Sequence, residues 1–204
     1  GKTDILIGTK MMAKGWDFPN VTLTGIIAAD LTLNFPDFRA AELTFQNITQ
    51  VAGRCGRGDS PGTVILQTYR PDEKVLQFGA AQDYKGFYNW ESSNRKLYGY
   101  PPYSQNLRVL FTAPRGYFSQ SDIDSIRSAF RDSSTEDNAI SILGPAPGIY
   151  RYSRDEERWV LNLMGEDLDE LKGIYKLALE KMMKEKIMDN SVKIQAEINP
   201  IHIV

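Results

Sequence analysis

The sequence predicts an α/β protein with two unlike parts joined by a helical segment. Two observations lead to this prediction. In residues 1–71, short apolar runs alternate with an amphipathic helix, which is the pattern of a parallel sheet. In residues 105–204, strand and helix patterns follow each other in the order β-α-β-β-α-β. Residues 72–104 indicate helix, and we treat them as a connector between two domains.

The first domain begins with a continuous apolar run. Residues 4–8 predict a buried parallel strand, and residues 21–30 predict a second one. Asp37 is the expected N-cap of a helix that extends to about Gly53, because apolar side chains recur after it at helical spacing. A Pro-Gly turn then leads to a third strand over residues 62–68.

The connector predicts one long helix over residues 72–98, closed by Gly99 and a pair of prolines. Its aromatic side chains either stack on nucleic-acid bases or pack the helix onto a neighbouring domain, and packing is the preferred interpretation. These aromatic residues are Phe78, Tyr84, Phe87, Tyr88 and Trp90.

The last domain has the pattern of a small α+β unit. Its order of elements is that of a split βαβ, or ferredoxin-like, unit. The expected elements are strands over residues 107–111, 139–143, 158–164 and 192–198, and helices over residues 121–132 and 167–186.

Composition limits the compartment and the partners. No stretch approaches the ~20 apolar residues that a membrane-spanning helix needs, and the start lacks a signal-peptide pattern. One cysteine, Cys55, makes neither an internal disulfide nor a zinc site by itself, so we expect no metal here and a reducing cytoplasm. The net charge of −2 argues against a free-standing basic nucleic-acid module.

The most informative motif is the run QVAGRCGRG at residues 50–58. It places two arginines three residues apart at the end of a predicted helix, each beside a glycine. Arginine presents a rigid fork of N–H donors to phosphate oxygens, and glycine lets backbone approach a ligand. This pattern is typical of an arginine finger, which stabilises charge on a transferring γ-phosphoryl group. A glycine-capped helix end with two cations on the helix dipole explains the same residues.

Several ordered motifs together resemble a known family. Residues 5–21 and 50–58 resemble motifs V and VI of superfamily 2 helicases. The exact residues of these and other motifs resemble the PriA family of primosomal, replication-restart DNA helicases even more closely. The resemblance extends over essentially the whole chain. The segments that carry it are GTKMMAKG at 8–15, FPNV at 18–21, DFRAAE at 37–42, PPY at 101–103 and LGPAP at 143–147.

The resemblance implies that residues 1–71 belong to a second RecA-like helicase lobe of an ATP-dependent 3′→5′ DNA helicase. The sequence contains neither the phosphate loop nor the Mg²⁺-binding acidic motif, so we interpret it as a C-terminal fragment without ATPase activity of its own. ATP and Mg²⁺ would bind mostly through the missing first lobe, and the family's Zn²⁺ through cysteines outside this chain. Implied partners are branched or single-stranded DNA, replication-restart proteins and single-stranded DNA-binding protein, with no membrane.

The resemblance also assigns nucleotide-binding roles to the motif at residues 50–58. Arg57 aligns with the γ-phosphate finger, and Arg54 would contact the same phosphates or hold the finger in place. Gln50 faces the same side one helical turn earlier, where it would contact nucleotide or the partner lobe. Gly53 belongs to the same nucleotide-binding group.

Motif V supplies a second group. Gly15 and Asp17 match positions at which an acidic residue near the ribose or the finger couples nucleotide state to DNA. Thr9 and Lys14 suit a contact with a DNA phosphate, through one hydroxyl and one cation. Strand-end capping by Thr9 and simple solvent exposure of Lys14 are the alternatives.

A cluster of cations and aromatics in the last domain is a candidate DNA surface. Its members suit stacking on bases combined with phosphate neutralisation, and the corresponding PriA domain assists recognition of branched DNA. Acidic residues at 155–157 interrupt the cluster, and packing of the tryptophan with solubilising arginines explains it equally well. The cluster comprises Arg151, Tyr152, Arg154, Arg158 and Trp159.

Two other functions stay open at this point. Another superfamily 2 enzyme would share motif VI, although the PPY and LGPAP segments disfavour it. A non-enzymatic module that binds DNA or protein would need no phosphate loop. An uncovered apolar face on the first domain would favour dimerisation of the isolated chain.

Overall fold

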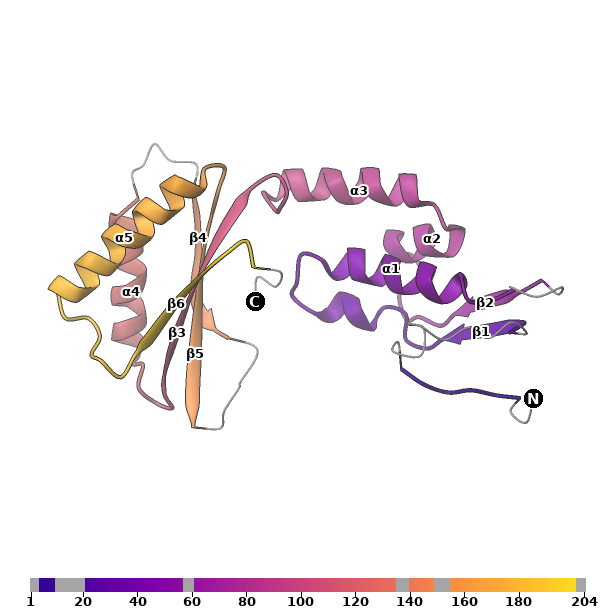
Figure 1. The fold of residues 1–204 in the computed structure, drawn as a ribbon, viewed down its shortest axis with the longest axis horizontal. Coiled ribbons are helices and arrows are strands. Elements are labelled where there is room, and N and C mark those ends of the chain that lie inside the picture. The colour runs from indigo at the N-terminus through magenta and orange to yellow at the C-terminus, as the bar shows by residue number, and fades with distance from the viewer. Residues whose placement is uncertain (1–3, 10–20, 57–60, 135–139, 149–154, 201–204) are drawn as a thin grey trace. The chain divides into compact units, whose positions relative to one another are not determined.

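The computed structural model describes residues 4–9, 21–56, 61–134, 140–148 and 155–200 (Figure 1). The chain forms two compact units, Gly1–Ser93 and Asn94–Val204. The first contains a two-stranded parallel sheet and the second a separate four-stranded antiparallel sheet. The predicted α/β class is therefore confirmed.

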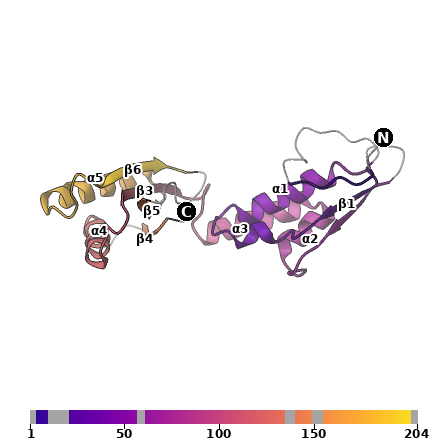
Figure 2. The same ribbon diagram turned by 90° about the horizontal axis from the view of Figure 1, so that it is seen from below.

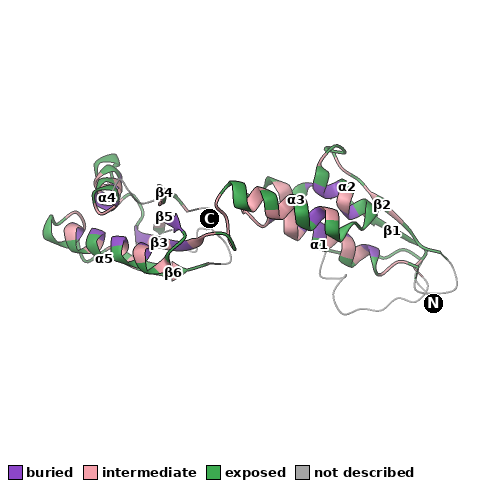
Figure 3. Ribbon diagram, turned by 90° about the horizontal axis from the view of Figure 1, so that it is seen from above, coloured by how far each residue is buried: buried purple, intermediate pink, exposed green. Residues whose placement is uncertain are grey.

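The first unit packs helices against one face of its sheet. Parallel pairing places Leu23 opposite Thr63 and Ile26 opposite Leu66. Ile26 and Leu66 pack against a core that α1 and α2 also line, and Figure 3 shows the buried positions along these helices. Its elements are β1 (Leu23–Ile26), the 3-10 helix η2 (Leu31–Asn34), α1 (Ala40–Ala52), β2 (Thr63–Leu66), α2 (Lys74–Ala81) and the greater part of α3 (Tyr84–Leu97), whose last turn belongs to the second unit.

The strand expected over residues 4–8 is not formed. This segment has no regular secondary structure, and Ile5 and Ile7 are 79% and 88% exposed. A buried parallel strand needs paired neighbours and a layer on each face. The described residues of this unit supply β1, β2 and a single helical layer, so the prediction of a buried strand here is wrong for this chain.

Two predicted helices have different limits in the structure. α1 begins at Ala40 rather than after Asp37, because the Asp37 carboxylate accepts the backbone N–H of Arg39 at 2.8 Å and closes a turn before the helix. The long helix predicted over residues 72–98 is broken at Gln82, whose φ of 51° is left-handed. The break separates α2 from α3 and lets both helices contribute to the same core.

The second unit has the predicted order of elements. Its strands lie in the order β4-β5-β3-β6, and each paired neighbour is antiparallel. The helices α4 and α5 lie on the same side of this sheet (Figures 1 and 2). The elements are β3 (Gln105–Pro114), α4 (Gln120–Asp132), β4 (Ser141–Pro147), β5 (Glu156–Gly165), α5 (Leu168–Lys184) and β6 (Lys193–Ile198).

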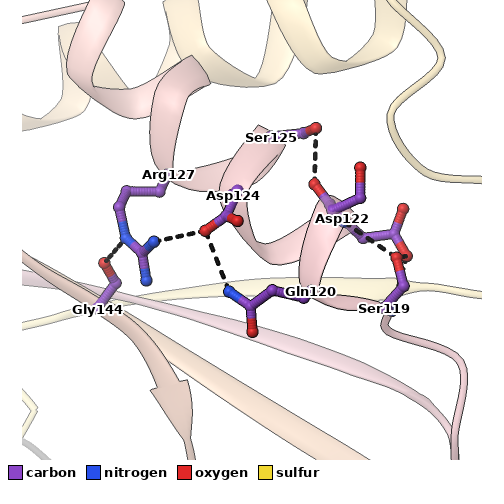
Figure 4. Close-up of polar contacts among 8 residues, drawn as sticks. Ser119, Gln120, Asp122, Asp124, Ser125, Arg127 and Gly144 are labelled. Atoms are coloured by element: carbon purple, nitrogen blue, oxygen red, sulfur yellow. Dashed lines mark hydrogen bonds and ion pairs between the residues drawn. The ribbon is translucent and has the colours of Figure 1, made fainter.

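Capping residues fix where the two helices of this unit begin. Ser119 and Asp122 form a capping box at the start of α4: the Ser119 Oγ accepts the Asp122 N–H, and the Asp122 carboxylate accepts the Ser119 N–H at 2.8 Å (Figure 4). The Asp167 carboxylate accepts the Asp169 N–H at 2.8 Å and caps the start of α5 with this single bond.

Strand periodicity separates the two faces of the second sheet. Val109 and Phe111 of β3 are fully buried in a core with Phe130 of α4 and Leu171 of α5. Because successive strand residues point to opposite faces, the alternate residues of β3 lie on the other side. We call this side, formed by Asn106, Arg108, Leu110 and Thr112 and their partners on β5 and β6, the far face.

Within the described parts of the chain, no helix combines the length and the apolar character needed to cross a lipid bilayer.

Candidate nucleotide and nucleic-acid sites

The arginine motif begins as a tight turn at the end of α1. Phe45, Ile48 and Ala52 bury one stripe of this helix against the core, which orients its C-terminal end. The Gly53 N–H donates to the Thr49 carbonyl at 2.9 Å, and the Arg54 N–H donates to a carbonyl three residues earlier at 3.0 Å. The chain therefore leaves the helix without a flexible spacer.

The same turn is attached to the sheet. The Gly56 N–H donates to the Val21 carbonyl at 3.0 Å, and the Cys55 thiol lies 3.4 Å from the Thr63 carbonyl oxygen. Gly56 has φ of +73°, and a Cβ on it would lie 2.7 Å from the Gly62 nitrogen. Only glycine satisfies both constraints, so one motif glycine has a backbone role of its own.

The structure places three of the predicted nucleotide-binding residues in this region. Gln50 and Gly53 are exposed, and Arg54 is half-buried immediately after them. Gln50 precedes Arg54 by four residues, about one helical turn. The proposed finger, Arg57, lies outside the described residues.

Most motif V residues also lie outside the described part of the chain. These are Lys14, Gly15 and Asp17. Thr9 is described and exposed, in a segment without secondary structure. Strand-end capping therefore does not account for Thr9 in this structure.

The cation-aromatic cluster is divided between two faces of a sheet. Trp159 lies opposite Phe111, and its ring meets that of Phe118 edge to face at 6.3 Å, beside the helix-covered core. Arg158 lies opposite Thr112 on the far face. The structure thus does not bring Arg158 and Trp159 onto one surface, and packing accounts for the tryptophan. Arg151 and Arg154 lie outside the described residues.

A buried carboxylate joins the ends of the two parallel strands. Asp30 follows β1 and accepts the backbone N–H of Tyr69, which follows β2, at 3.0 Å. Burial by itself would raise the pKa of Asp30, but hydrogen bonds from Thr68 and Tyr69 and the charge of Arg70 outweigh it and lower the pKa below its usual value. The geometry gives Asp30 a structural role.

Comparison with known proteins identifies the family. No model of a protein family matches the chain. The Replication restart protein PriA of Bacillus subtilis (strain 168) is 38% identical over 200 residues, which cover 98% of this chain and 24% of the relative. The chain belongs to the PriA family. Its PriA relative from Synechocystis sp. is 37% identical over 205 residues, covering 100% of this chain and 24% of that protein.

Other PriA proteins match a shorter segment more closely. The relative from Chlamydia trachomatis serovar D is 50% identical over 111 residues, or 54% of this chain and 15% of the relative. The PriA-family chain thus spans about a quarter, or less, of the length of these relatives. The designed protein Foldit4 aligns with 48% of the chain at a TM-score of 0.37 and 10% identity, which supports no statement about function.

The structure of this PriA-family chain adds two residues that the sequence did not suggest. Thr112, which is 7% exposed, lies between Arg158 of β5 and Lys193 of β6 on the far face. The buried Thr112 Oγ1 has no hydrogen-bond partner among the residues that the structure describes. Two cations thus flank the buried Thr112 on the far face, and cationic side chains of this kind contact phosphate groups in protein–DNA complexes. The register of three strands creates this row, and no local sequence signal predicts it.

Proposed function

We propose that this chain supplies the second RecA-like motor lobe and a ferredoxin-like domain to an ATP-dependent 3′→5′ DNA helicase that restarts replication at stalled or branched forks. The observation that carries the proposal is the 38% identity to a replication restart protein over 98% of this chain. Attachment of the arginine motif to the sheet supports it, because groups that act on a transferring phosphoryl need rigid support.

In this proposal the chain contributes donors to a nucleotide held between two lobes. Arg57 and Arg54 donate to the γ-phosphate, and Gln50 and the exposed backbone of Gly53 adjoin the same ligand. ATP and Mg²⁺ are held mostly by residues outside this chain. The donor set fits a phosphate, since it combines guanidinium forks with a glycine backbone that leaves space. Without its partner lobe, the chain hydrolyses no ATP.

The DNA-binding residues divide between the two units. In the first, Thr9 and Lys14 contact phosphate, while Gly15 and Asp17 couple nucleotide state to the strand. In the second unit, Arg158 contacts DNA together with Arg151 and Arg154. Single- or branched-strand DNA, replication-restart proteins and single-stranded DNA-binding protein are the proposed partners, in the cytoplasm. Zinc, where the longer relatives hold it, is bound outside this chain.

The test is an Arg57→Ala substitution in the full-length protein that contains this chain. An arginine finger contributes roughly 10³–10⁵ in rate, so ATP hydrolysis falls by that order while binding to forked DNA persists. Arg70→Ala is the matched control, because Arg70 is an exposed cation of the same unit that pairs with Glu73. Equal loss of fork binding and ATPase would contradict the finger role.

A second function is a non-enzymatic nucleic-acid module. The cations Arg158 and Lys193, which flank Thr112 on the far face, favour it, since phosphate binding there needs no nucleotide. The intact mass of the native protein from its source cells separates the two proposals. A chain several times longer supports the helicase, whereas a chain of this length supports the module.

A further inference from the structure

Helix α3 carries two kinds of aromatic residue. Phe87 is 5% exposed and stacks on Phe45 with ring centroids 4.2 Å apart, and the Trp90 ring packs against Phe87 at 6.2 Å. Tyr84 and Tyr88 are instead 65% and 56% exposed. Packing in the core therefore explains Phe87 and Trp90. It does not explain Tyr84 and Tyr88, whose side chains are mostly exposed.

The two tyrosine rings form a short ladder along the helix. They are four residues apart, so they share one face of α3. Their centroids are 6.3 Å apart and their planes differ by 28°. The spacing is close to twice the ~3.4 Å rise between stacked bases of a nucleic-acid strand. The Tyr84 ring also packs against the Phe45 ring, with centroids 6.3 Å apart, and this contact limits its movement.

The Lys85 side chain supplies a positive charge next to the two tyrosines in the sequence. Lys85 is exposed and has no hydrogen bond or ion pair within the described part of the chain. The acidic groups nearby are Asp83, whose carboxylate accepts the Gly86 N–H at 2.9 Å, and Glu91, one turn beyond Tyr88. Exposed flat rings next to a free ammonium group are what a single nucleic-acid strand requires: a stacking surface for bases and a positive charge for the backbone.

We propose that Tyr84 and Tyr88 form a stacking platform for the bases of a single DNA strand, with Lys85 on the adjacent phosphate. The platform rests on the proposed function, which supplies the single strand. It adds a contact outside the helicase motifs, on a helix that follows the motor lobe. A duplex keeps its bases stacked on one another and does not engage the platform.

The first experiment measures binding of a fluorescein-labelled oligothymidylate to the chain by anisotropy. Stacking on one aromatic ring changes binding by roughly 5- to 150-fold, so we expect Tyr84→Leu and Tyr88→Leu each to weaken it within that range. Tyr84→Phe and Tyr88→Phe keep the ring and bind like the wild type. Tyr69→Leu is the matched control, because Tyr69 is 89% exposed in the same unit but outside the ladder.

Lys85→Gln tests the phosphate contact. Loss of one phosphate contact lowers the slope of log affinity against log salt by about 1. Thermal unfolding by circular dichroism accompanies each variant, because Tyr84 touches Phe45 and its loss must not unfold the unit. Tyr88→Leu, at the position farther from Phe45, keeps the test decisive if the Tyr84→Leu chain is unstable.

Three results would overturn the platform: no binding of the wild-type chain to oligothymidylate, unchanged binding in Tyr88→Leu, or an equal loss in Tyr69→Leu. A fourth comes from nitration of the full-length protein. If Tyr84 and Tyr88 resist nitration without DNA, another part of that protein covers them. None of these results alters the ATPase test with Arg57→Ala, so the platform and the proposed function fail separately.

Discussion

Asp30 accepts the backbone N–H of Tyr69 at 3.0 Å, across 39 residues of sequence. The bond joins the segments that follow β1 and β2, so the carboxylate holds together the C-terminal ends of the two parallel strands. Among the described residues of the first unit, Asp30 is the only buried charged side chain, and it links the segments that follow the two strands.

This contact makes stability depend on pH in the acid range. The ordinary pKa of Asp30 is 3.8 and the folded state lowers it, so its contribution is complete above about pH 3.8 and is lost as the pH falls through the lower, folded value. We expect Asp30→Asn to reduce the urea midpoint at neutral pH, and the gap from the wild type to close in acid. Midpoints measured at several pH values check this. A gap that stays constant with pH would refute it.

Gly56 is expected to tolerate no side chain. Its φ of +73° and the 2.7 Å separation that an added Cβ would have from the Gly62 nitrogen predict that Gly56→Ala destabilises the first unit by roughly 1–3 kcal/mol. Gly173→Ala is the control, because a Cβ there meets nothing within 4 Å inside α5, and alanine should stabilise that helix by about 0.5–1 kcal/mol. Chemical denaturation measures both, and effects of the same sign would contradict the geometry.

The capping box at the start of α4 predicts a local loss. Ser119→Ala removes the acceptor for the Asp122 N–H and should cost about 1 kcal/mol of stability in the second unit. Ser128→Ala is a matched control on the exposed side of the same helix, since the Ser128 side chain makes no hydrogen bond in the described structure. Hydrogen exchange of the first turn of α4 reports the effect, and equal behaviour of the two variants would count against the cap.

Substitutions of Trp159 and of Arg158 should affect different properties of the chain. Trp159→Ala removes a ring packed beside the core and should cost roughly 3 kcal/mol of stability. Arg158→Gln should lower the slope of log DNA affinity against log salt by about 1. Lys176→Gln, a cation on the exposed side of α5, is the control. DNA binding that is insensitive to Arg158 would remove it from the interface.

The second unit was the more predictable part of the fold. Its strands and helices carry clear periodic patterns, and Ser119 and Asp167 signal where helices begin. The separation of Arg158 from Trp159 also follows from strand periodicity, because adjacent residues of a strand point to opposite faces. Grouping them by sequence proximity missed this consequence. The row of Thr112 and Lys193 needed the register of three strands, which sequence alone does not supply.

The first unit was less predictable because apolar character does not identify a partner. Residues 4–8 have the composition of a buried strand, yet no strand pairs with them in the described structure. The break at Gln82 was missed because a residue other than glycine adopts the left-handed conformation there. Propensity gives little warning of such a position.

The chain has two separate cores, and this has a consequence for any measurement of its stability. The outer side of the β1–β2 pair leaves Leu23 and Ile65 61% and 55% exposed, whereas Val109 and Phe111 of β3 are fully buried. Because each unit has a core of its own, calorimetry of the chain should give two overlapping transitions, with the antiparallel unit melting last. A single midpoint would then average two free energies, and each variant is better followed by a probe within its own unit.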